Sequence, residues 1–214
     1  MKVKLLTLDG KNKGDVDLSD KIFSLKPQKD IIQTIVDYQL QHFKPRTAKV
    51  KQRNEIRGST AKIYAQKGTG GARHSSRKAP IFVGGGIAHG PKGAVYSTKK
   101  VNKKIKKIGL LHALSAKKKF NSLYVVEDFK SEIKKTKIFN NFLEKNKLTN
   151  TLLIADKDSR NKIIRSVRNI PSLKLIEQEG TNVHDLIKYK NVLFTTSSIK
   201  SLQERLIKWK IFTI

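Results

Sequence analysis

Short runs of apolar residues recur through the second half of the chain, separated by amphipathic stretches. Four runs have the composition of strands: residues 123–127, 151–155, 173–176 and 192–195. The stretches between and after them show helical periodicity, near residues 137–147, 160–169, 183–189 and 199–208. The runs at 152–155 and 192–194 are apolar throughout, as in strands covered on both faces. This alternation predicts an α/β fold, a three-layer sandwich with a mostly parallel sheet.

The first half of the chain adds the remaining elements of the sandwich. Residues 3–8 are predicted to form a strand, followed by a short return strand at 14–18. Apolar residues at helical spacing predict two long helices, over residues 27–43 and 101–119, with a very different segment inserted between them. The predicted organisation is a globular α/β domain and a long basic, largely irregular extended loop: residues 1–43 with 99–214, and residues 44–98.

The segment between these helices differs from the rest of the chain in charge and composition. Residues 44–107 contain eighteen Lys or Arg and a single acid, Glu55, and hold nine of the thirteen glycines. No leucine lies between Leu40 and Leu110, although the chain has twenty. Ordering the backbone costs roughly 1–2 kcal/mol per residue, and so few apolar side chains cannot offset that cost, so we expect no separate core here. A basic, glycine-rich sequence is typical of a chain that places its backbone against phosphates.

The charge of the whole chain indicates a polyanionic partner. The formal net charge is +29 at pH 7, and such a surplus opposes a compact state and favours polyanion binding. A nucleic acid is the commonest polyanion, whereas a membrane-surface helix would need the leucines that residues 44–107 lack. The absence of cysteine excludes disulfides and thiolate metal sites. The N-terminus lacks the apolar run of a signal peptide and no stretch reaches the length of a membrane span, so we expect an untargeted chain with no membrane partner.

Two glycine-rich motifs resemble nucleotide-binding loops without meeting their requirements. Residues 68–73 would need a glycine in place of Arg73 to form a dinucleotide fingerprint. Residues 85–91 have Pro91 where a phosphate-binding loop needs lysine, and proline also removes a backbone donor. Flexible linkers are the alternative interpretation of both clusters, although basic residues are interleaved throughout them.

No arrangement of residues in the sequence indicates catalysis. The five histidines show no i, i+4 pairing, and His112 lies among apolar residues, which predicts a core position rather than a metal ligand. Residues 156–159 follow a predicted strand and precede a helix, where open α/β sheets bind ligands, but no nucleophile or phosphate loop accompanies them. We interpret them as a helix N-cap provided by Asp158 or Ser159. We therefore predict no enzymatic activity, no metal and no cofactor.

Several motifs occur together and in the order seen in one family. They are Gln66–His74 (QKGTGGARH), Ala79-Pro80, Phe82–Gly86 (FVGGG), His89-Gly90-Pro91 and Leu110–Ala116 (LLHALSA). Together they resemble the bacterial large-subunit ribosomal protein L4 (uL4) family, and the resemblance covers essentially the whole chain. The chain departs from the family at residues 61–65, where a Lys-Pro-Trp is common, and at Gly71, where arginine is common. Stacking by an aromatic residue near the tip is therefore left to Tyr64.

The resemblance implies a structural constituent of the large ribosomal subunit, which binds 23S-type rRNA, aids its assembly and lines the polypeptide exit tunnel with the extended loop. Neighbouring ribosomal proteins including L22 and the nascent peptide would be its partners, in a bacterial cytoplasmic ribosome or an organellar one. The tip near the tunnel would be Gln66, Lys67, Gly68, Thr69, Gly70, Gly71, Ala72 and Arg73. Close backbone approach to RNA is expected at Gly84, Gly85, Gly86 and Gly90. The residues expected to bind rRNA are Arg46, Lys49, Lys51, Arg53, Arg57, Lys62, Lys67, Arg73, His74, Arg77, Lys78, Lys92, Lys99, Lys100, Lys103 and Lys104.

Two other functions stay open at this point. The chain could be a regulator that binds messenger RNA, including its own, or DNA, or it could be a nucleotide-dependent enzyme that uses the sheet edge at Asp156. The aromatic residues of the loop leave a similar choice, because each could stack on an unpaired base or pack on its own hairpin. These residues are Tyr64, Phe82 and Tyr96.

Overall fold

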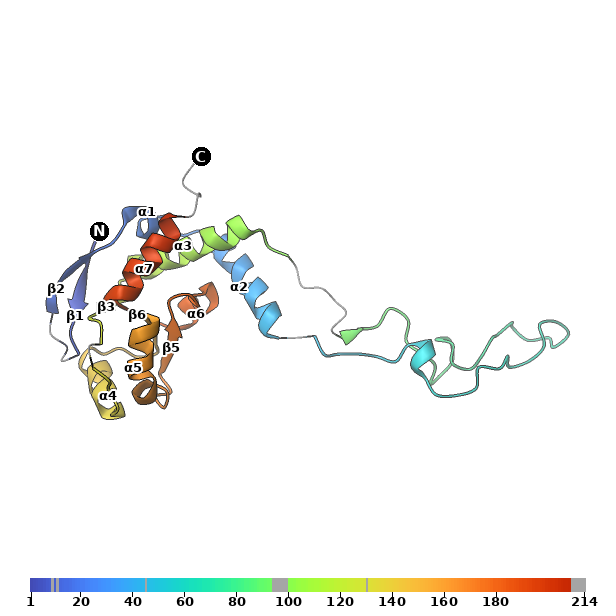
Figure 1. Cartoon of the computed structure of the whole chain (residues 1–214). Helices are drawn as coiled ribbons and strands as arrows, with labels where there is room; N and C mark the ends of the chain where they lie inside the picture. Colours follow the sequence, from blue (N-terminus) through green and yellow to red (C-terminus); the bar gives the residue numbers. More distant parts are fainter. Residues whose placement is uncertain (9, 11, 45, 94–99, 130, 209–214) are drawn as a thin grey trace. The chain divides into compact units, whose positions relative to one another are not determined.

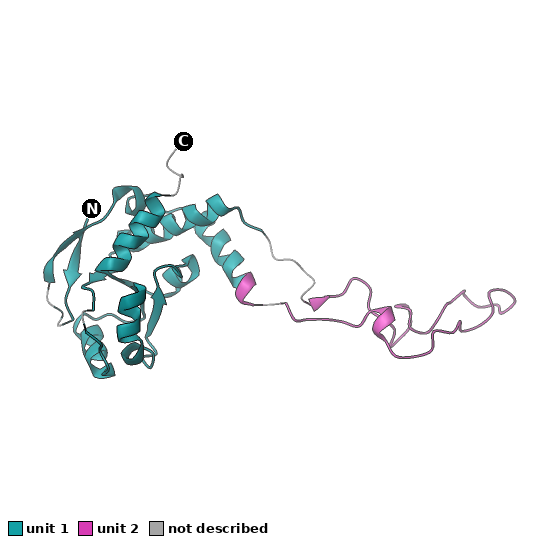
Figure 2. Ribbon diagram, viewed as in Figure 1, with its two compact units in different colours: residues 1–40, 100–214 teal, residues 41–99 magenta. Residues whose placement is uncertain are grey.

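The structure is a computed structural model of the chain, and it describes residues 1–8, 10, 12–44, 46–93, 100–129 and 131–208. The chain divides into two compact units (Figure 2): unit 1 is Met1–Leu40 with Lys100–Ile214, and unit 2 is Gln41–Lys99. That the globular part folds as a domain without the loop stays a prediction. Tyr96, a candidate for stacking on a base, and Lys99, a predicted rRNA-binding residue, lie outside the described residues.

Unit 1 contains a six-stranded sheet in the order β2-β1-β3-β6-β4-β5. The strands are β1 (Lys2–Leu6), β2 (Asn12–Asp17), β3 (Leu123–Val126), β4 (Thr151–Ala155), β5 (Leu173–Glu177) and β6 (Asn191–Thr195). Strand β2 pairs antiparallel with β1, and every other neighbouring pair is parallel. The helices between the strands make the crossovers that parallel pairing requires. The predicted mostly parallel α/β fold is therefore confirmed.

Helices cover both faces of this sheet (Figure 1). They are α1 (Asp20–Phe23), α2 (Lys29–Phe43), α3 (Lys103–Lys119), α4 (Thr136–Lys145), α5 (Lys157–Val167), α6 (Val183–Lys188) and α7 (Thr196–Ile207). Alternate residues of β4 enter different cores: Leu152 and Ile154 pack with α1, α2, α3, α6 and α7, whereas Leu153 and Ala155 pack with α4 and α5. This period of two is what a strand buried on both faces requires. The result is three layers with two apolar cores.

Two details of unit 1 differ from the sequence-based expectation. The N-cap of α5 is Asp156, not Asp158 or Ser159, because the helix begins directly after β4 and Asp156 keeps the extended backbone of the strand. Its carbonyl oxygen accepts a hydrogen bond from the backbone of Arg160 at 2.8 Å. The four-residue helix α1 was not predicted, since it is too short to show a period. The core position predicted for His112 is confirmed, because only 8% of this residue is exposed.

Helix α2 packs closely against Gly109, which lies inside α3. A Cβ atom built there would stand 1.8 Å from Cδ1 of Ile35, a fully buried residue of α2. Alanine is the better helix former by about 1 kcal/mol, but an overpacked core typically costs about 1–3 kcal/mol. We therefore expect Gly109→Ala to lower the free energy of unfolding, measured by urea denaturation.

The matched test of this prediction removes the clashing atom. Ile35→Val deletes Cδ1, so the double variant should recover part of the stability that Gly109→Ala loses. A Gly109→Ala protein that is as stable as the parent would show that the two helices separate without cost.

Candidate nucleic-acid interface

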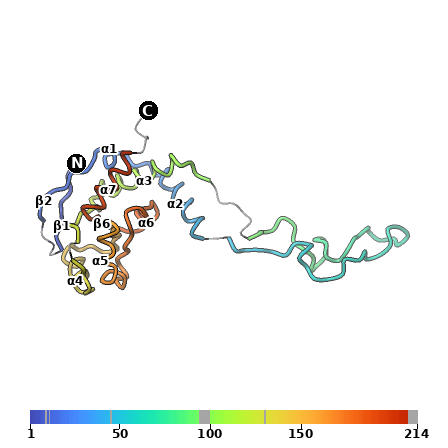
Figure 3. The backbone as a smooth tube through the Cα atoms, in the orientation of Figure 1, coloured from blue at the N-terminus to red at the C-terminus, as the bar shows by residue number. Residues whose placement is uncertain are grey.

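Unit 2 is built as a hairpin whose two arms are joined by backbone hydrogen bonds (Figure 3). The amide of Val50 donates to the carbonyl of Pro91 at 3.0 Å, and residues 49 and 92 form an isolated antiparallel bridge. Further along, the amide of Ile63 donates to the carbonyl of Ser75 at 2.8 Å. The end of the hairpin is therefore formed by residues 64–74, which include the predicted tip.

Packing inside unit 2 does not depend on an apolar core. No described residue of the segment 41–93 belongs to either core cluster. Instead, the ring of His74 packs edge-on against two aromatic rings, with its centroid 6.2 Å from that of Tyr64 and 4.8 Å from that of Phe82. Of the two alternatives for these aromatic residues, packing on their own hairpin is the one seen for Tyr64 and Phe82. The half-buried His74, a predicted RNA ligand, is part of this cluster.

The returning arm makes a compact excursion at residues 76–86 before it rejoins the outgoing arm. The amide of Gly86 donates to the carbonyl of Lys78, and the next amide, of Ile87, donates to Lys51, each at 3.0 Å. A Cβ atom on Gly85 would lie 2.0 Å from the carbonyl oxygen of Ala79, and one on Gly86 would lie 2.3 Å from the amide nitrogen of Arg53. These two glycines are thus required by contacts within the chain, which the sequence did not reveal.

The other two glycines predicted to approach RNA have different surroundings. A Cβ atom on Gly90 would lie 2.2 Å from Cγ2 of Val50. Gly84 has a φ of +78°, which side chains rarely adopt, and nothing lies within 4 Å of the position of its missing Cβ. Gly84 therefore leaves open space next to the backbone, and the approach of RNA at these four glycines stays a prediction.

A Gly86→Ala variant tests whether this packing matters for binding. The added methyl group would meet backbone atoms of Arg53 that cannot rotate away, so the two arms should separate. Because the cations on the two arms would then lose their arrangement, we expect the affinity for RNA to fall about tenfold, or about 1.4 kcal/mol, measured by fluorescence anisotropy. Gly180→Ala is the control, since its Cβ meets nothing closer than 3.5 Å. Unchanged affinity of Gly86→Ala would contradict the prediction.

Unit 2 contains thirteen Lys or Arg residues and only one acid. Its single acid, Glu55, pairs with Lys49 at 2.8 Å and ends the short 3-10 helix η1 (Arg53–Glu55), which is closed by a capping box with Gln52. The hydrogen bond from the Lys49 side chain, followed by that from the backbone of Gln52, lowers the pKa of Glu55, so this carboxylate is charged at neutral pH. It compensates one cation and leaves the others of unit 2 without an acid of the same unit.

The structure places most of the predicted RNA-binding residues in solvent. Half-buried positions are found at His74 and Lys78. Arg53 also bonds within the hairpin, with Nη2 3.2 Å from Oγ of Ser75. The predicted ligands that are exposed are Arg46, Lys49, Lys51, Arg53, Arg57, Lys62, Lys67, Arg73, Arg77 and Lys92 in unit 2, and Lys100, Lys103 and Lys104 in unit 1.

The tip, Gln66 to Arg73, is exposed throughout and turns by means of glycines. Gly68 and Gly70 have φ values of +84° and +67°, in the left-handed region where a side chain would strain the backbone. The hydroxyl of Tyr64 donates to the carbonyl of Ala72 and closes the turn. Glycine at 68 and 70 is therefore explained by the turn itself.

The described parts of the chain were also searched for a metal site, a membrane-spanning helix and a nucleotide site. No group of three or more His, Asp or Glu residues could hold a metal ion there. None of the helices in those parts combines the length and the apolar character needed to cross a membrane. At the sheet edge considered for a nucleotide, Asp156 serves as the N-cap of α5.

Comparisons with known proteins agree with the resemblance seen in the sequence. Residues 16–205 match the family described as "Ribosomal protein L4/L1 family". A protein named "Large ribosomal subunit protein uL4" from Pelagibacter ubique (strain HTCC1062) is 51% identical over 206 residues, covering 96% of this chain and 99% of that protein. Proteins of the same name are 40% identical in Desulforapulum autotrophicum, covering 95% of this chain and 97% of that protein, and 42% identical in Bradyrhizobium sp. (strain ORS 278), covering 96% and 99%.

These matches span nearly the whole chain, so both units are included in the relationship. They confirm the predicted family, and because this family is structural and non-enzymatic, they also confirm the prediction that the chain is not an enzyme. The chain therefore belongs to the ribosomal protein L4/L1 family, among the bacterial-type uL4 proteins of the large ribosomal subunit.

Proposed function

We propose that the chain binds 23S-type rRNA mainly through unit 2, aids the assembly of this RNA and lines the polypeptide exit tunnel with the tip at residues 66–73. One observation carries the proposal: unit 2 holds thirteen Lys or Arg against one acid, and the described ones are nearly all exposed on a hairpin whose described residues belong to neither apolar core. Contacts with phosphates neutralise such a surface and release counterions, which drives binding.

The start of helix α3 supplies a second group of cations. Lys103 and Lys104 occupy its first turn, which contains no acid. Cations at a helix N-terminus are disfavoured by the helix dipole, whereas an anion there is favoured. A phosphate close to Lys100, Lys103 and Lys104 would relieve this repulsion, which supports their proposed role in RNA binding.

The further proposed partners follow from the proposed tunnel location. Protein L22 and the nascent peptide would meet the tip at residues 66–73, and the relatives named above come from bacterial strains, which supports a place in the bacterial cytoplasmic ribosome. A cross-linking map from unit 2 to rRNA within intact large subunits tests the proposal directly. Cross-links confined to unit 1 would overturn it.

A charge reversal at Lys67 tests the position of the tip. Lys67 is exposed and contributes to neither core, so Lys67→Glu should leave the stability of unit 1 unchanged. A carboxylate placed against phosphates repels them, so the variant should enter ribosomes yet alter the response to macrolides or to stalling peptides. The control is Lys137→Glu, exposed on α4. Fully assembled Lys67→Glu ribosomes with unchanged drug response and stalling would place the tip elsewhere.

A further inference from the structure

Unit 2 contains a small hollow of about 320 Å³ that is lined by hydrogen-bond donors. The residues that line it are Arg53, Asn54, Thr60, Ser76 and Lys78. Each of these side chains carries N–H or O–H groups, and none of these residues is an acid. We call this hollow the donor pocket. Its volume lies at the lower end of the range of about 300–1,000 Å³ that is usual for sites of small ligands.

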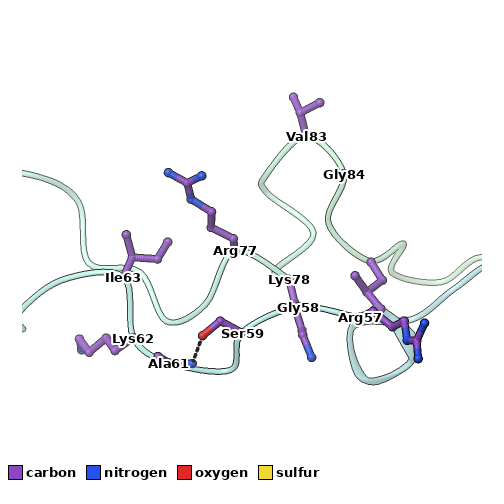
Figure 4. Close-up of a pocket in the computed structure, with 11 residues that line it drawn as sticks. Arg57, Gly58, Ser59, Ala61, Lys62, Ile63, Arg77, Lys78, Val83 and Gly84 are labelled. Atoms are coloured by element: carbon purple, nitrogen blue, oxygen red, sulfur yellow. Dashed lines mark hydrogen bonds between the residues drawn. The ribbon is translucent and has the colours of Figure 1, made fainter.

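Contacts between the two arms of the hairpin bring the residues of the donor pocket together. Gly86 touches both cationic residues: its amide donates to the carbonyl of Lys78 at 3.0 Å, and the position of its missing Cβ lies 2.3 Å from the amide nitrogen of Arg53. In Figure 4, the side chain of Lys78 runs past Gly58 of the outgoing arm. Its Cε atom lies 3.7 Å from the position of the Cβ that Gly58 lacks. Lys78 therefore reaches the outgoing arm close to Thr60.

The donors of this pocket are almost unused within the protein. Only 2% of Ser76 is exposed, yet its hydroxyl makes no hydrogen bond with any described residue. The guanidinium of Arg53 donates through Nη2 to Oγ of Ser75 at 3.2 Å, which holds this cation beside Ser76. The other lining side chains that lack a hydrogen bond or ion pair with a described residue are Asn54, Thr60 and Lys78. Because polar groups of buried residues are normally paired, this arrangement indicates an acceptor from outside the chain.

We propose that the donor pocket holds one phosphate group of an RNA backbone. The phosphate oxygens would accept hydrogen bonds from the hydroxyl of Ser76 and from the cations of Arg53 and Lys78. Phosphate fits because it carries negative charge and its oxygens point in several directions, and hydrogen bonds between ionised groups are the strong ones. A carboxylate has two oxygens in one plane and would leave part of these donors unpaired.

The inference rests on the proposed RNA binding and makes one contact of it specific. Elsewhere in unit 2, exposed cations would meet phosphates at the surface. In the donor pocket, one phosphate would be bound by side chains from both arms, including a neutral hydroxyl of a buried residue. The bound phosphate would thereby join residues 53–60 to residues 76–78.

The first measurement uses inorganic phosphate and the full-length protein. In an NMR titration at constant ionic strength, the amide shifts should saturate and should concentrate at residues 53–54, 60 and 76–78. Ser76→Ala should weaken phosphate binding at least about tenfold, the lower end of the effect of a hydrogen bond to a charged group.

Two further variants separate a lost site from a lost fold. Thr60→Val removes a second hydroxyl of the donor pocket at an exposed position and should also weaken phosphate binding, although it cannot act by disrupting buried packing. Thr47→Ala removes an exposed hydroxyl of unit 2 outside the pocket and should bind phosphate like the parent.

The second measurement tests whether the phosphate belongs to RNA. Binding of large-subunit rRNA fragments is followed by fluorescence anisotropy at several salt concentrations. Ser76→Ala should lower the affinity about tenfold and leave the slope of log K against log salt unchanged, because no charge is altered. Bound rRNA should also prevent inorganic phosphate from shifting the amides of residues 76–78.

Several results would overturn the inference or its basis. Equal phosphate binding by the parent, Ser76→Ala and Thr60→Val would refute the phosphate site and leave the proposed function intact. Weak binding of rRNA by the parent would refute the proposed function itself. If acetate shifted the same amides as strongly as phosphate, the donor pocket would be a carboxylate site. If Ser76→Ala weakened the binding of phosphate but not of rRNA, the pocket would take free phosphate instead of a phosphate of RNA.

Discussion

Replacing residues 46–98 with a Gly-Ser linker of about ten residues should leave a protein that unfolds cooperatively but binds large-subunit rRNA at least about a thousandfold more weakly. Folding should survive because every described residue of the two apolar cores lies outside the replaced segment. A shorter connection between α2 and α3 also lowers the entropy of loop closure. The affinity should fall because eleven Lys or Arg residues are removed, and a difference of about 10³ or more separates specific from non-specific nucleic-acid binding.

Thermal denaturation, monitored by circular dichroism, tests whether the shortened protein unfolds cooperatively. Filter binding to rRNA tests whether its affinity falls. A second variant keeps the length of the loop and changes its exposed Lys and Arg residues to Ser. It should fold in the same way and lose a comparable part of the affinity, because charge and not length carries the binding. Loss of the cooperative transition in the shortened protein would show that unit 1 depends on unit 2, and would refute the domain organisation predicted from the sequence.

The affinity of the intact protein for rRNA should fall by about 10⁴- to 10⁵-fold when the salt concentration is raised fourfold, if ten phosphates are neutralised. The expected slope of log K against log salt is about −0.7 to −0.9 for each phosphate. Such a steep dependence follows from exposed cations, of which the single acid of unit 2 compensates only one. The measurement is a titration of binding between about 0.1 and 0.4 M monovalent salt, within the range where screening is strong.

Single charge removals make this prediction specific. Arg57→Gln and Arg73→Gln should each make the slope shallower by about 0.7 to 0.9, because both side chains are exposed and unit 2 offers them no acid. Lys137→Gln, on the surface of α4, should leave the slope unchanged. A shallow slope in the parent protein would mean that stacking or base recognition, rather than contact with phosphates, dominates the affinity.

Much of unit 1 could be predicted from the sequence, because its signals are local. The apolar runs that form β4 and β6 and the helical spacing along α2 and α3 indicate which side chains face a core, because hydrophobic periodicity is a local property of the sequence. The alternation of strands and helices along the sequence was enough to predict a mostly parallel sheet. The strand order β2-β1-β3-β6-β4-β5 could not be read in this way, since it depends on which buried surfaces meet after the chain has crossed over.

In unit 2, the sequence by itself determined the charge, the glycine content, the lack of a core and the family, because these are properties of composition and of motifs in order. Only the tertiary structure decided what individual residues do there. Gly85 is needed because the backbone of Ala79 lies close to it, and Gly86 because the backbone of Arg53 does; His74 packs against Tyr64 and Phe82, and the one acid is held by Lys49. No local period relates the residues in these contacts, and the contact between Gly86 and Arg53 exists only once the two arms of the hairpin lie side by side.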